Sequence, residues 1–539
     1  MAGRTRIRAR LALTAVTGLA LTVSGLAVGA PPTSAAPACA SVDPGGGSWP
    51  SYGHDLSNSR TQDQESSIGA ANVASLKAHW SFSTAAGGGG TVQTTPAVAD
   101  GCVFFGTSSG RMLALNADTG AVVWSVQLVS PSTPAGLGGL LVGAPAVDSA
   151  AHRVIVAVDQ TGGPFVVSLD ELTGATQWTS LPVDSVTDGP WGAVSGDNAG
   201  PTVANGKVFL GFYGSEFTAD ARGGFVILDE ATGSRLAHTY IIPDADYALG
   251  YRGASVWATA AIDPVGGYAY VGTGNPGGHP APGADPSQFP QCVGTLPGQP
   301  CNAAIEHPNS DAILKIDFHS APPLLGTIVG VYKGNPENYA GGLDRQPACA
   351  NAGNVEAGVG GDGVNGWSVA CLQLDLDFGA SPNLIVGPGG LVVGELQKSG
   401  VYHAVDAATM NKSWTTPIGG PCAACNAAST ASDANGIYGE GAPGGIMVSL
   451  GLTGAYRWGT PVGDGVHYES TSTANGVAYT VDNAGFLDAF DAGTGAPVLK
   501  HPLAGDVGQP VSDVSSAGVA IARHTVYAAE AGYVVAYGL

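Results

Sequence analysis

Short apolar runs, separated by polar and glycine-rich turns, recur along the chain after its first forty residues. One such unit, PAVADGCVFFGTSSGRMLAL at residues 96–115, reads as strand, turn, strand, glycine-rich turn and strand. Apolar runs of this length, bounded by Gly, Pro and Asp, are typical of β-strands. The pattern therefore predicts an all-β protein built from many short antiparallel strands.

A second pattern, A-x-D-x-x-T-G-x-x-x-W, closes each unit. Asp and the Thr-Gly pair suit a tight turn between the third and fourth strands, where Gly supplies a positive φ. We expect the Trp that follows to pack flat between neighbouring units. The copies are ALNADTGAVVW, SLDELTGATQW, ILDEATGSRLA, KIDFHSAPPLL, AVDAATMNKSW, SLGLTGAYRW and AFDAGTGAPVL, and an eighth begins at VAYG, residues 535–538.

Four short strands per repeat are typical of a propeller blade. The eighth copy stops before its fourth strand, and Leu76–Ser83 can supply that strand and close the ring. Closure removes exposed sheet edges. The sequence thus predicts a single eight-bladed β-propeller over residues 41–539.

Long segments rich in Pro, Gly, Asn and Cys occur at residues 277–310 and 335–371, where we expect loops inserted into blades 4 and 5. Function often resides in such loops. Just before the first lies Ser255–Pro276, which predicts a hairpin with Trp257 at the head of one strand and Asn275 just past the other. These side chains could face one pocket; the alternative is a core tryptophan and a turn asparagine.

The amino-terminal forty residues have a different composition. Four arginines precede the apolar run Leu11–Ala30 and a small-residue segment, which is the pattern of a secretory signal peptide. Cleavage after Ala36 and cleavage at Ala38-Cys39-Ala40 both stay open, and an uncleaved membrane anchor is an alternative. We expect residues 1–40 to direct export to the extracellular or cell-envelope space, without stable membrane insertion of the mature chain.

Charge and cysteine content refine this prediction. The formal net charge is −22, which disfavours nucleic acid and anionic membrane surfaces as partners. Export makes the eight cysteines candidates for disulfides that staple loops. In sequence order they fall as Cys39/Cys102, Cys292/Cys301, Cys349/Cys371 and Cys422/Cys425; three of these pairs are close enough for local bridges, and the connectivity stays open. No C-x-x-C-H haem-attachment motif occurs.

Four features together resemble the pyrroloquinoline quinone (PQQ)-dependent alcohol dehydrogenases, particularly the polyvinyl-alcohol-dehydrogenase-like branch. They are WPSYGHDLSNSR, the tryptophan repeats, VGTGNP and LDLDFGASP. The tryptophan repeats alone are less specific, because non-catalytic propellers such as the outer-membrane assembly lipoprotein carry them too. The adjacent-cysteine disulfide of many methanol- and ethanol-oxidising members is absent from this chain.

The resemblance implies a role for each of five residues. Trp257 would stack on PQQ, and Lys398 would contact the quinone oxygens. Glu216 and Asn275 would bind PQQ and ligate an active-site Ca²⁺, with Asp377 as a further metal ligand and the catalytic base. Gly379 stands where lanthanide-using relatives carry an extra carboxylate, which favours Ca²⁺.

Each assignment has a structural alternative. Glu216 could be an exposed turn carboxylate, Asp377 a turn cap and Lys398 a solvated loop charge; Asp375 is a rival for the base. We treat His279 and His307 as surface residues. The expected function is oxidation of an alcohol, for example polyvinyl alcohol or another secondary or polymeric alcohol. The alternative is a cofactor-free propeller that acts as a protein-binding or assembly scaffold.

Overall fold

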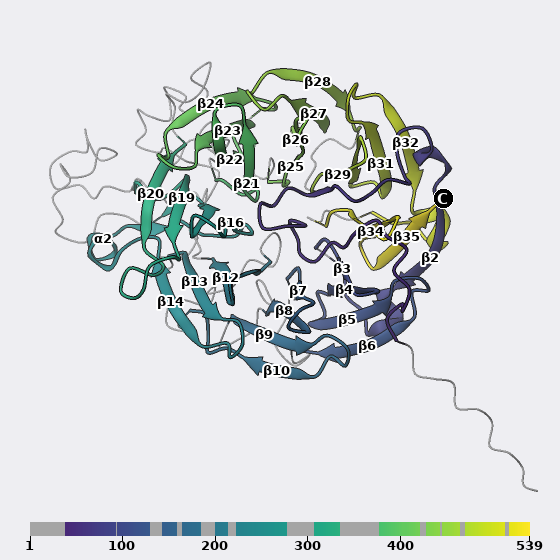
Figure 1. Cartoon of the computed structure of the whole chain (residues 1–539), viewed down its shortest axis with the longest axis horizontal. Coiled ribbons are helices and arrows are strands. Elements are labelled where there is room, and N and C mark those ends of the chain that lie inside the picture. Colours follow the sequence, from purple (N-terminus) through teal and green to yellow (C-terminus); the bar gives the residue numbers. More distant parts are fainter. Residues whose placement is uncertain are drawn as a thin grey trace, which may run out of the picture. The chain divides into compact units, whose positions relative to one another are not determined.

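Eight antiparallel sheets surround a common axis and form the eight-bladed β-propeller that the repeats predict (Figure 1). This computed structural model describes residues 38–92, 94–129, 143–158, 164–184, 200–213, 222–277, 307–334, 377–420, 427–441, 445–463, 469–512 and 517–539. The predicted insertions at residues 277–310 and 335–371 therefore lie mostly outside the described residues. Pro37–Leu539 make up one compact unit.

In each blade the first strand lies nearest the axis and the fourth lies at the rim (Figure 1). Blade 1 is β3 (Ala97–Ala99), β4 (Cys102–Gly106), β5 (Arg111–Asn116) and β6 (Val122–Gln127). Blade 2 is β7 (Ala146–Asp148), β8 (Arg153–Val158), β9 (Phe165–Asp170) and β10 (Thr176–Thr179). Blade 3 is β11 (Thr202–Ala204), β12 (Lys207–Phe212), β13 (Gly224–Asp229) and β14 (Arg235–Tyr240). Blade 4 is β16 (Ala261–Asp263), β17 (Tyr268–Gly272), β19 (Ala312–Asp317) and β20 (Ile328–Lys333).

The remaining blades follow the same order. Blade 5 is β21 (Asn383–Gly387), β22 (Gly390–Leu396), β23 (Val401–Asp406) and β24 (Lys412–Pro417). Blade 6 is β25 (Ala431–Ser432), β26 (Ile437–Gly441), β27 (Ile446–Leu450) and β28 (Tyr456–Pro461). Blade 7 is β29 (Ser472–Ala474), β30 (Val477–Val481), β31 (Phe486–Asp491) and β32 (Pro497–Pro502). Blade 8 is β33 (Ala520–Ala522), β34 (Thr525–Glu530), β35 (Tyr533–Gly538) and, from the other end of the chain, β2 (Lys77–Ser83).

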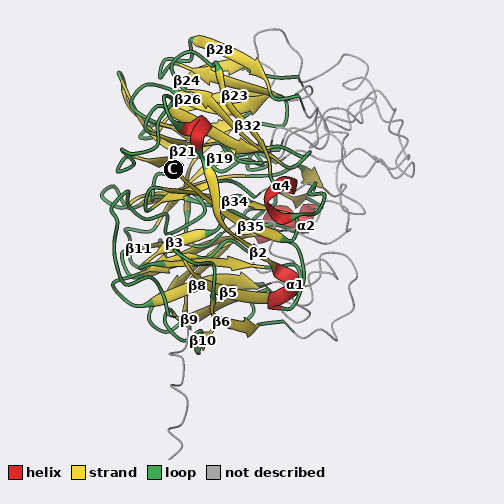
Figure 2. Cartoon of the chain, turned by 90° about the vertical axis from the view of Figure 1, so that its right-hand side faces the viewer, coloured by secondary structure: helices red, strands yellow, loops and turns green. Residues whose placement is uncertain are grey.

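The pairing of β2 with β35 confirms the predicted ring closure. Lys77 lies opposite Gly538 and Ser83 opposite Tyr533 in an antiparallel ladder. Outside the blades, the strands are β1 (Thr61–Gln62), which extends blade 7, and the pair β15 (Arg252–Gly253) and β18 (Pro276–Gly277). The helices are η1 (Val73–Ser75), α1 (Thr84–Gly87), α2 (Asp244–Leu249) and α4 (Ala504–Val507). Figure 2 shows α1, α2 and α4 at the same end of the propeller.

The repeated motif joins neighbouring blades at five of the boundaries that the structure describes. In blade 2 the Asp170 carboxylate accepts hydrogen bonds from the Thr173 amide (2.9 Å) and hydroxyl (2.6 Å). Gly174 follows at φ 69°, and Trp124 of the preceding blade packs on it. A Cβ atom on Gly174 would lie 2.8 Å from the indole. Glycine is therefore required here for its backbone conformation and for the close approach of the ring. The same contact joins Trp80 to Gly120, Trp178 to Gly233, Trp414 to Gly454 and Trp458 to Gly495.

At the boundary between blades 4 and 5 the large and small partners are exchanged. Blade 4 has Gly330 at the tryptophan position, and the blade 5 turn has Met410 at φ 58° at the glycine position. A Cβ on Gly330 would lie 2.6 Å from Met410 Cγ. Two other groups of blade 4, Lys315 Nζ and Tyr270 Oη, each donate to the Ala407 carbonyl at 2.9 Å. They replace the indole N–H, which elsewhere donates to the equivalent carbonyl, as Trp124 does to Glu171 (2.8 Å).

Residues 47–62, which include the WPSYGHDLSNSR motif, run around the axis inside the ring, and we call them the inner belt (Figure 1). The carbonyls of the inner belt accept from the first strand, or the turn after it, of successive blades. The donors are the amides of Arg523, Val98 and Val147 in blades 8, 1 and 2, and of Ile262, Leu384, Ser432 and Thr473 in blades 4 to 7, at 2.6–3.1 Å. The inner belt therefore fastens the innermost strands to one another.

We predict that Gly174→Ala destabilises the protein by about 2–4 kcal/mol, because it adds the clash with Trp124 to the strain of a left-handed alanine. Gly206→Ala is the matched control: Gly206 has φ 70°, but its Cβ position has no neighbour within 4 Å. We expect only about 1–2 kcal/mol there. Urea unfolding of both variants measures the difference, and equal losses would contradict the role assigned to the indole contact.

Candidate functional site

The predicted hairpin of blade 4 is present, with one difference. Strand β16 pairs with β17 across the turn at Asp263–Gly267, but Trp257 lies in the loop four residues before β16 and does not head the strand. Two backbone hydrogen bonds of 2.8 Å bring the outer ends together, from the Ala254 amide to the Asn275 carbonyl and from the Gly274 amide to the Ser255 carbonyl. A Cβ on Gly274 would lie 3.4 Å from Trp257 Nε1. Trp257 and Asn275 therefore flank one small region.

Asp377 enters this region from the loop that precedes blade 5. The Phe378 amide donates to the Thr273 carbonyl at 3.1 Å, which attaches the loop to the end of β17. The Asp377 carboxylate is buried, and its Oδ1 accepts from the backbone amide of Asn275. Its other oxygen, Oδ2, is 2.6 Å from Lys398 Nζ. The carboxylate thus has a fixed orientation with an amide on one side and an ammonium on the other.

Lys398 completes the group from the loop between the second and third strands of blade 5. Its amide donates to the Asp377 carbonyl at 3.0 Å, and its side chain is 8% exposed. The ammonium lies 4.4 Å from the centroid of the Trp257 ring, within the range of a cation–π contact. A buried ion pair of this kind is costly to break, because the remaining charge would lack a partner.

Four of the five predicted residues therefore meet at the boundary between blades 4 and 5: Trp257, Asn275, Asp377 and Lys398. Glu216 lies outside the described residues, as do Asp375 and His279. Within the described residues no three acidic, histidine or cysteine side chains gather as a metal site. Gly379, the position discussed for lanthanide-using relatives, brings no carboxylate and lies beside Trp257, its Cβ position 3.6 Å from the indole.

Two further expectations can be compared with the structure. The sequence placed His307 at the surface, and this prediction was wrong. The side chain of His307 is buried, its Nε2 lies 3.1 Å from Asp246 Oδ2, and burial lowers its pKa. Its ring packs edge-on against Tyr251. Cys39 and Cys102, the first two cysteines of the sequence, form a disulfide, a connectivity that the sequence had left open. The other six cysteines lie outside the described residues.

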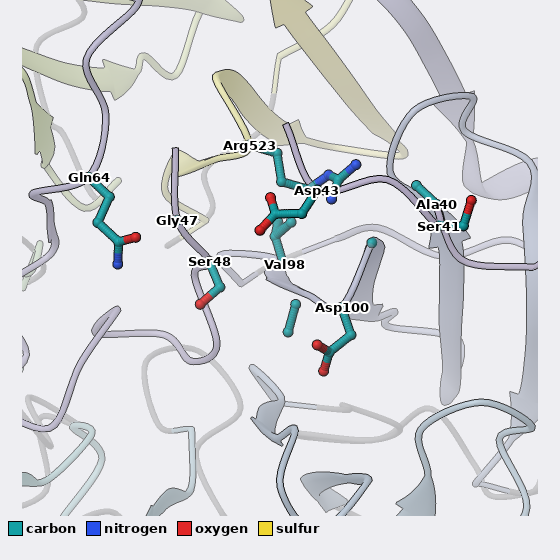
Figure 3. Close-up of a pocket in the computed structure, with 11 residues that line it drawn as sticks. Ala40, Ser41, Asp43, Gly47, Ser48, Gln64, Val98, Asp100 and Arg523 are labelled. Carbon is teal, nitrogen blue, oxygen red and sulfur yellow. The ribbon is translucent and has the colours of Figure 1, made fainter. Parts of the chain in front are cut away.

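A separate cavity of about 570 Å³ lies beside the inner belt, lined in part by Asp43, Asp100 and Arg523 (Figure 3). Asp100 and Arg523 belong to turns between first and second strands, whereas the site residues belong to loops before first strands or after second strands. Because antiparallel strands alternate in direction, these two kinds of connection lie at opposite ends of the blades. The cavity is therefore distinct from the candidate site. No helix in the described ranges has the length and apolar character needed to cross a bilayer.

The sequence interpretation missed one buried acid beneath the site. Glu395 lies on β22, is fully buried, and its Oε1 packs against Gly272, beside Phe378. Neither carboxyl oxygen has a hydrogen-bond partner among the described residues. Burial raises the pKa of Glu395 well above its usual range, which favours the protonated, uncharged form of its carboxyl group. The available signal was one acidic residue in the otherwise apolar run GLVVGEL.

The neighbour of Glu395 across the sheet is also uncharged. His403 lies opposite Glu395 in the β22–β23 pair, and burial lowers its pKa to about 3. Its Nδ1 shares a hydrogen bond of 2.9 Å with the hydroxyl of Tyr332. Burial thus favours the uncharged forms of both Glu395 and His403 beneath the candidate site.

Glu395→Gln should remove a pH dependence of stability. The pKa of Glu395 is raised in the folded state, so above about pH 4.5 the native protein binds more protons than the unfolded chain. The free energy of unfolding then falls as pH rises, by up to about 1.4 kcal/mol per pH unit from this group. Urea unfolding at pH 5, 6.5 and 8 measures the free energy of unfolding of both proteins. The value for the glutamine variant, relative to that for the wild type, should rise with each step in pH. A constant difference across this range would contradict the neutral state of Glu395.

Comparison with known proteins concerns the propeller as a whole. Residues 49–284 match the family model of the PQQ-type glucose/ethanol/alcohol dehydrogenase β-propeller domain. A polyvinylalcohol dehydrogenase of a Pseudomonas species is 30% identical over 247 residues, which cover 42% of this chain and 36% of that protein. The dehydrogenase subunit of a quinone alcohol dehydrogenase of Gluconobacter oxydans (strain 621H) is 27% identical over 266 residues, or 44% and 34%. The chain thus spans about a third of the length of the curated relatives it matches.

Solved structures extend the likeness to most of the propeller. The crystal structure of quinohemoprotein alcohol dehydrogenase from Comamonas testosteroni covers 91% of this chain, and 80% of its own, with a TM-score of 0.64 and 17% identity. At that identity the likeness concerns the fold. Together with the family match, it confirms the resemblance inferred from the motifs: the propeller of this chain is similar to that of the PQQ-dependent alcohol dehydrogenases.

Proposed function

We propose that this protein is an exported quinoprotein dehydrogenase that oxidises an alcohol with PQQ and Ca²⁺. The observation that carries the proposal is the meeting of Trp257, Asp377 and Lys398 across one blade boundary, with Asn275 beside them. An aromatic face, a carboxylate and a cation are the groups that alcohol oxidation by a planar anionic quinone requires. The match of residues 49–284 to a PQQ-type domain supports the same choice.

The residues present fit the cofactor chemically. Trp257 is half-buried, and the residues at its edges are Gly274 and Gly379, whose missing side chains leave room beside the indole. The indole would provide a stacking platform for PQQ. The Lys398 ammonium would bind the quinone oxygens. The oxygens of Asn275, Asp377 and Glu216 are the hard ligands that Ca²⁺ prefers.

Each residue would then have a defined task. When bound, PQQ supplies the quinone that accepts the hydride of the substrate carbon, and Ca²⁺ polarises that quinone. Asp377 would take the hydroxyl proton of the alcohol on a carboxylate oxygen. Lys398 would stabilise negative charge next to that carboxylate. The backbone amide of Asn275 holds the carboxylate in place throughout.

We propose an alcohol substrate of the secondary or polymeric type, such as polyvinyl alcohol, because one of the relatives is a polyvinylalcohol dehydrogenase. A separate cytochrome c or other carrier would receive the electrons. The competing function is a cofactor-free scaffold for protein binding or assembly, because one fold can serve several functions.

Asp377→Asn distinguishes the enzyme from the scaffold. The amide keeps the size of the side chain but cannot accept the substrate proton, so we expect dye-linked alcohol oxidation to fall by about 10²–10⁴-fold. The variant should retain PQQ, measured by absorption after dialysis. Glu216→Ala should instead lose affinity for PQQ and Ca²⁺ together, because it removes a ligand.

The wild-type protein provides the decisive control. If it neither retains PQQ in the presence of Ca²⁺ nor oxidises any primary, secondary or polymeric alcohol, the dehydrogenase proposal fails. A cofactor-free scaffold for protein binding or assembly would then be the better supported function.

Metal removal gives an independent check. The protein charge available to the metal would come from Glu216 and Asp377 alone, since Gly379 adds no carboxylate, and this suits Ca²⁺ over a trivalent ion. Chelation should therefore release PQQ, and Ca²⁺ should restore its absorption spectrum. Restoration by La³⁺ but not by Ca²⁺ would contradict the metal assignment.

A further inference from the structure

Asn58 of the inner belt connects the two blades that carry the candidate site. Its side chain is buried, and its Nδ2 donates to the carbonyls of Thr259 (2.9 Å) and Pro382 (3.1 Å). Thr259 precedes β16 of blade 4, and Pro382 precedes β21 of blade 5. One amide group therefore bridges the boundary between these blades from inside the ring.

The bridged segments are those that position the site. Thr259 follows Trp257 by two residues, and Pro382 follows Asp377 by five. The site spans the same boundary through the hydrogen bonds from the Asn275 amide to Asp377 and from the Phe378 amide to the Thr273 carbonyl. Any change in the spacing of blades 4 and 5 would therefore alter the distance between the indole and the carboxylate.

Neighbouring blades are also joined at this height by a series of hydrogen bonds to hydroxyls. At equivalent positions of consecutive blades, a backbone amide donates to the hydroxyl of the next blade. The pairs are Gly200 to Thr259 (2.9 Å), Thr259 to Ser381 (3.1 Å), Ser381 to Ser429 (2.9 Å) and Ser429 to Ser470 (3.2 Å). Asn58 adds two hydrogen bonds at the boundary of blades 4 and 5, where the tryptophan contact at the rim is replaced by Gly330 and Met410.

The local structure is suited to an asparagine. Asn58 has φ 52°, a left-handed conformation that asparagine tolerates better than most residues. Its Oδ1 lies against Gly53, where a Cβ would collide with it. Its carbonyl accepts from Asn383 Nδ2 at 2.6 Å, and the same nitrogen donates to Thr430 of blade 6 at 3.0 Å. Asn383 thus holds the backbone of Asn58, and the contact of Oδ1 with Gly53 orients the side-chain amide.

We propose that Asn58 is a positioning residue that sets the spacing of Trp257 and Asp377 across the boundary of blades 4 and 5. The consequence for catalysis rests on the proposed function, while the spacing itself does not. Misplacement of reacting groups by about 1 Å can cost about 10²-fold in rate. Asn58 acts through the segments it holds and does not touch the candidate site itself.

Asn58→Gly tests this, because glycine accepts the positive φ without strain and removes both hydrogen bonds. Asn205→Gly is the matched control. Asn205 also has φ 52°, and its Nδ2 donates to Pro264 of the next blade at 3.1 Å, but in turns at the opposite end of the blades. Hydrogen–deuterium exchange of the full chain is measured at the amides of Asn275 and Phe378, which bond across the site boundary.

We expect both amides to exchange at least about fivefold faster in Asn58→Gly than in Asn205→Gly, as local opening becomes easier. PQQ affinity should fall about tenfold or more only in Asn58→Gly. Unchanged exchange at both amides would overturn the proposal. This outcome is distinct from failure of the proposed function, in which the wild type itself would not bind PQQ.

Asn58→Asp is the second variant, and it is used if the glycine variant does not fold. Aspartate also tolerates a positive φ, but its ionised carboxylate faces two carbonyls with no hydrogen to donate. When protonated it can donate to one of them. Exchange at Asn275, relative to the wild type at the same pH, should therefore slow as pH falls. A pH-independent ratio near one would also overturn the proposal.

Discussion

The contact between a tryptophan and the glycine turn of the next blade is the interaction on which the ring depends. The turn residue must have a positive φ and no side chain, because the indole occupies the space of its Cβ, as at Gly174 and Trp124. This contact sets the distance between blades at the rim, and with it the positions of the loops at the blade ends. Around blade 4 the contact is altered, since Ala237 meets Gly326 and Gly330 meets Met410. The candidate site lies at this altered boundary, which is fastened on the inside by the belt.

Much of the fold followed from local patterns. The number of blades could be counted because each carries its own turn motif, and the closure by β2 followed from one missing strand. The hairpin pattern placed Trp257 and Asn275 together, and the resemblance to the PQQ-dependent family selected Asp377 and Lys398. All four stand in loops at the same end of a blade. Strand direction brings such loops together whatever the details of packing. The sequence could therefore predict that these four residues lie close together, whereas their roles are a proposal.

Other features depend on contacts between distant residues and left weak local signals. Backbone carbonyls set the path of the inner belt, and every residue type has one. The motif WPSYGHDLSNSR therefore indicated a family but did not predict the path of this segment. Glu395 appears as one acid in an apolar strand, and its neutral state follows from Gly272 and Phe378, far away in sequence. His307 was placed at the surface because its partner Asp246 lies 61 residues earlier, in α2. Trp257 was placed at the head of a strand because the apolar run that contains it begins several residues before β16 does, at Ala261.

The inner belt also has a consequence for how the chain acquires its structure. Arg60 is fully buried and donates to the carbonyl of Thr471, 411 residues further along. Belt residues that are made first can thus reach their final contacts only after blades 7 and 8 exist. Contacts of such long sequence separation slow folding, since the loop entropy is lost before they form. The ring is therefore expected to assemble late and cooperatively, and a chain that lacks its last blade leaves the belt without its final anchors.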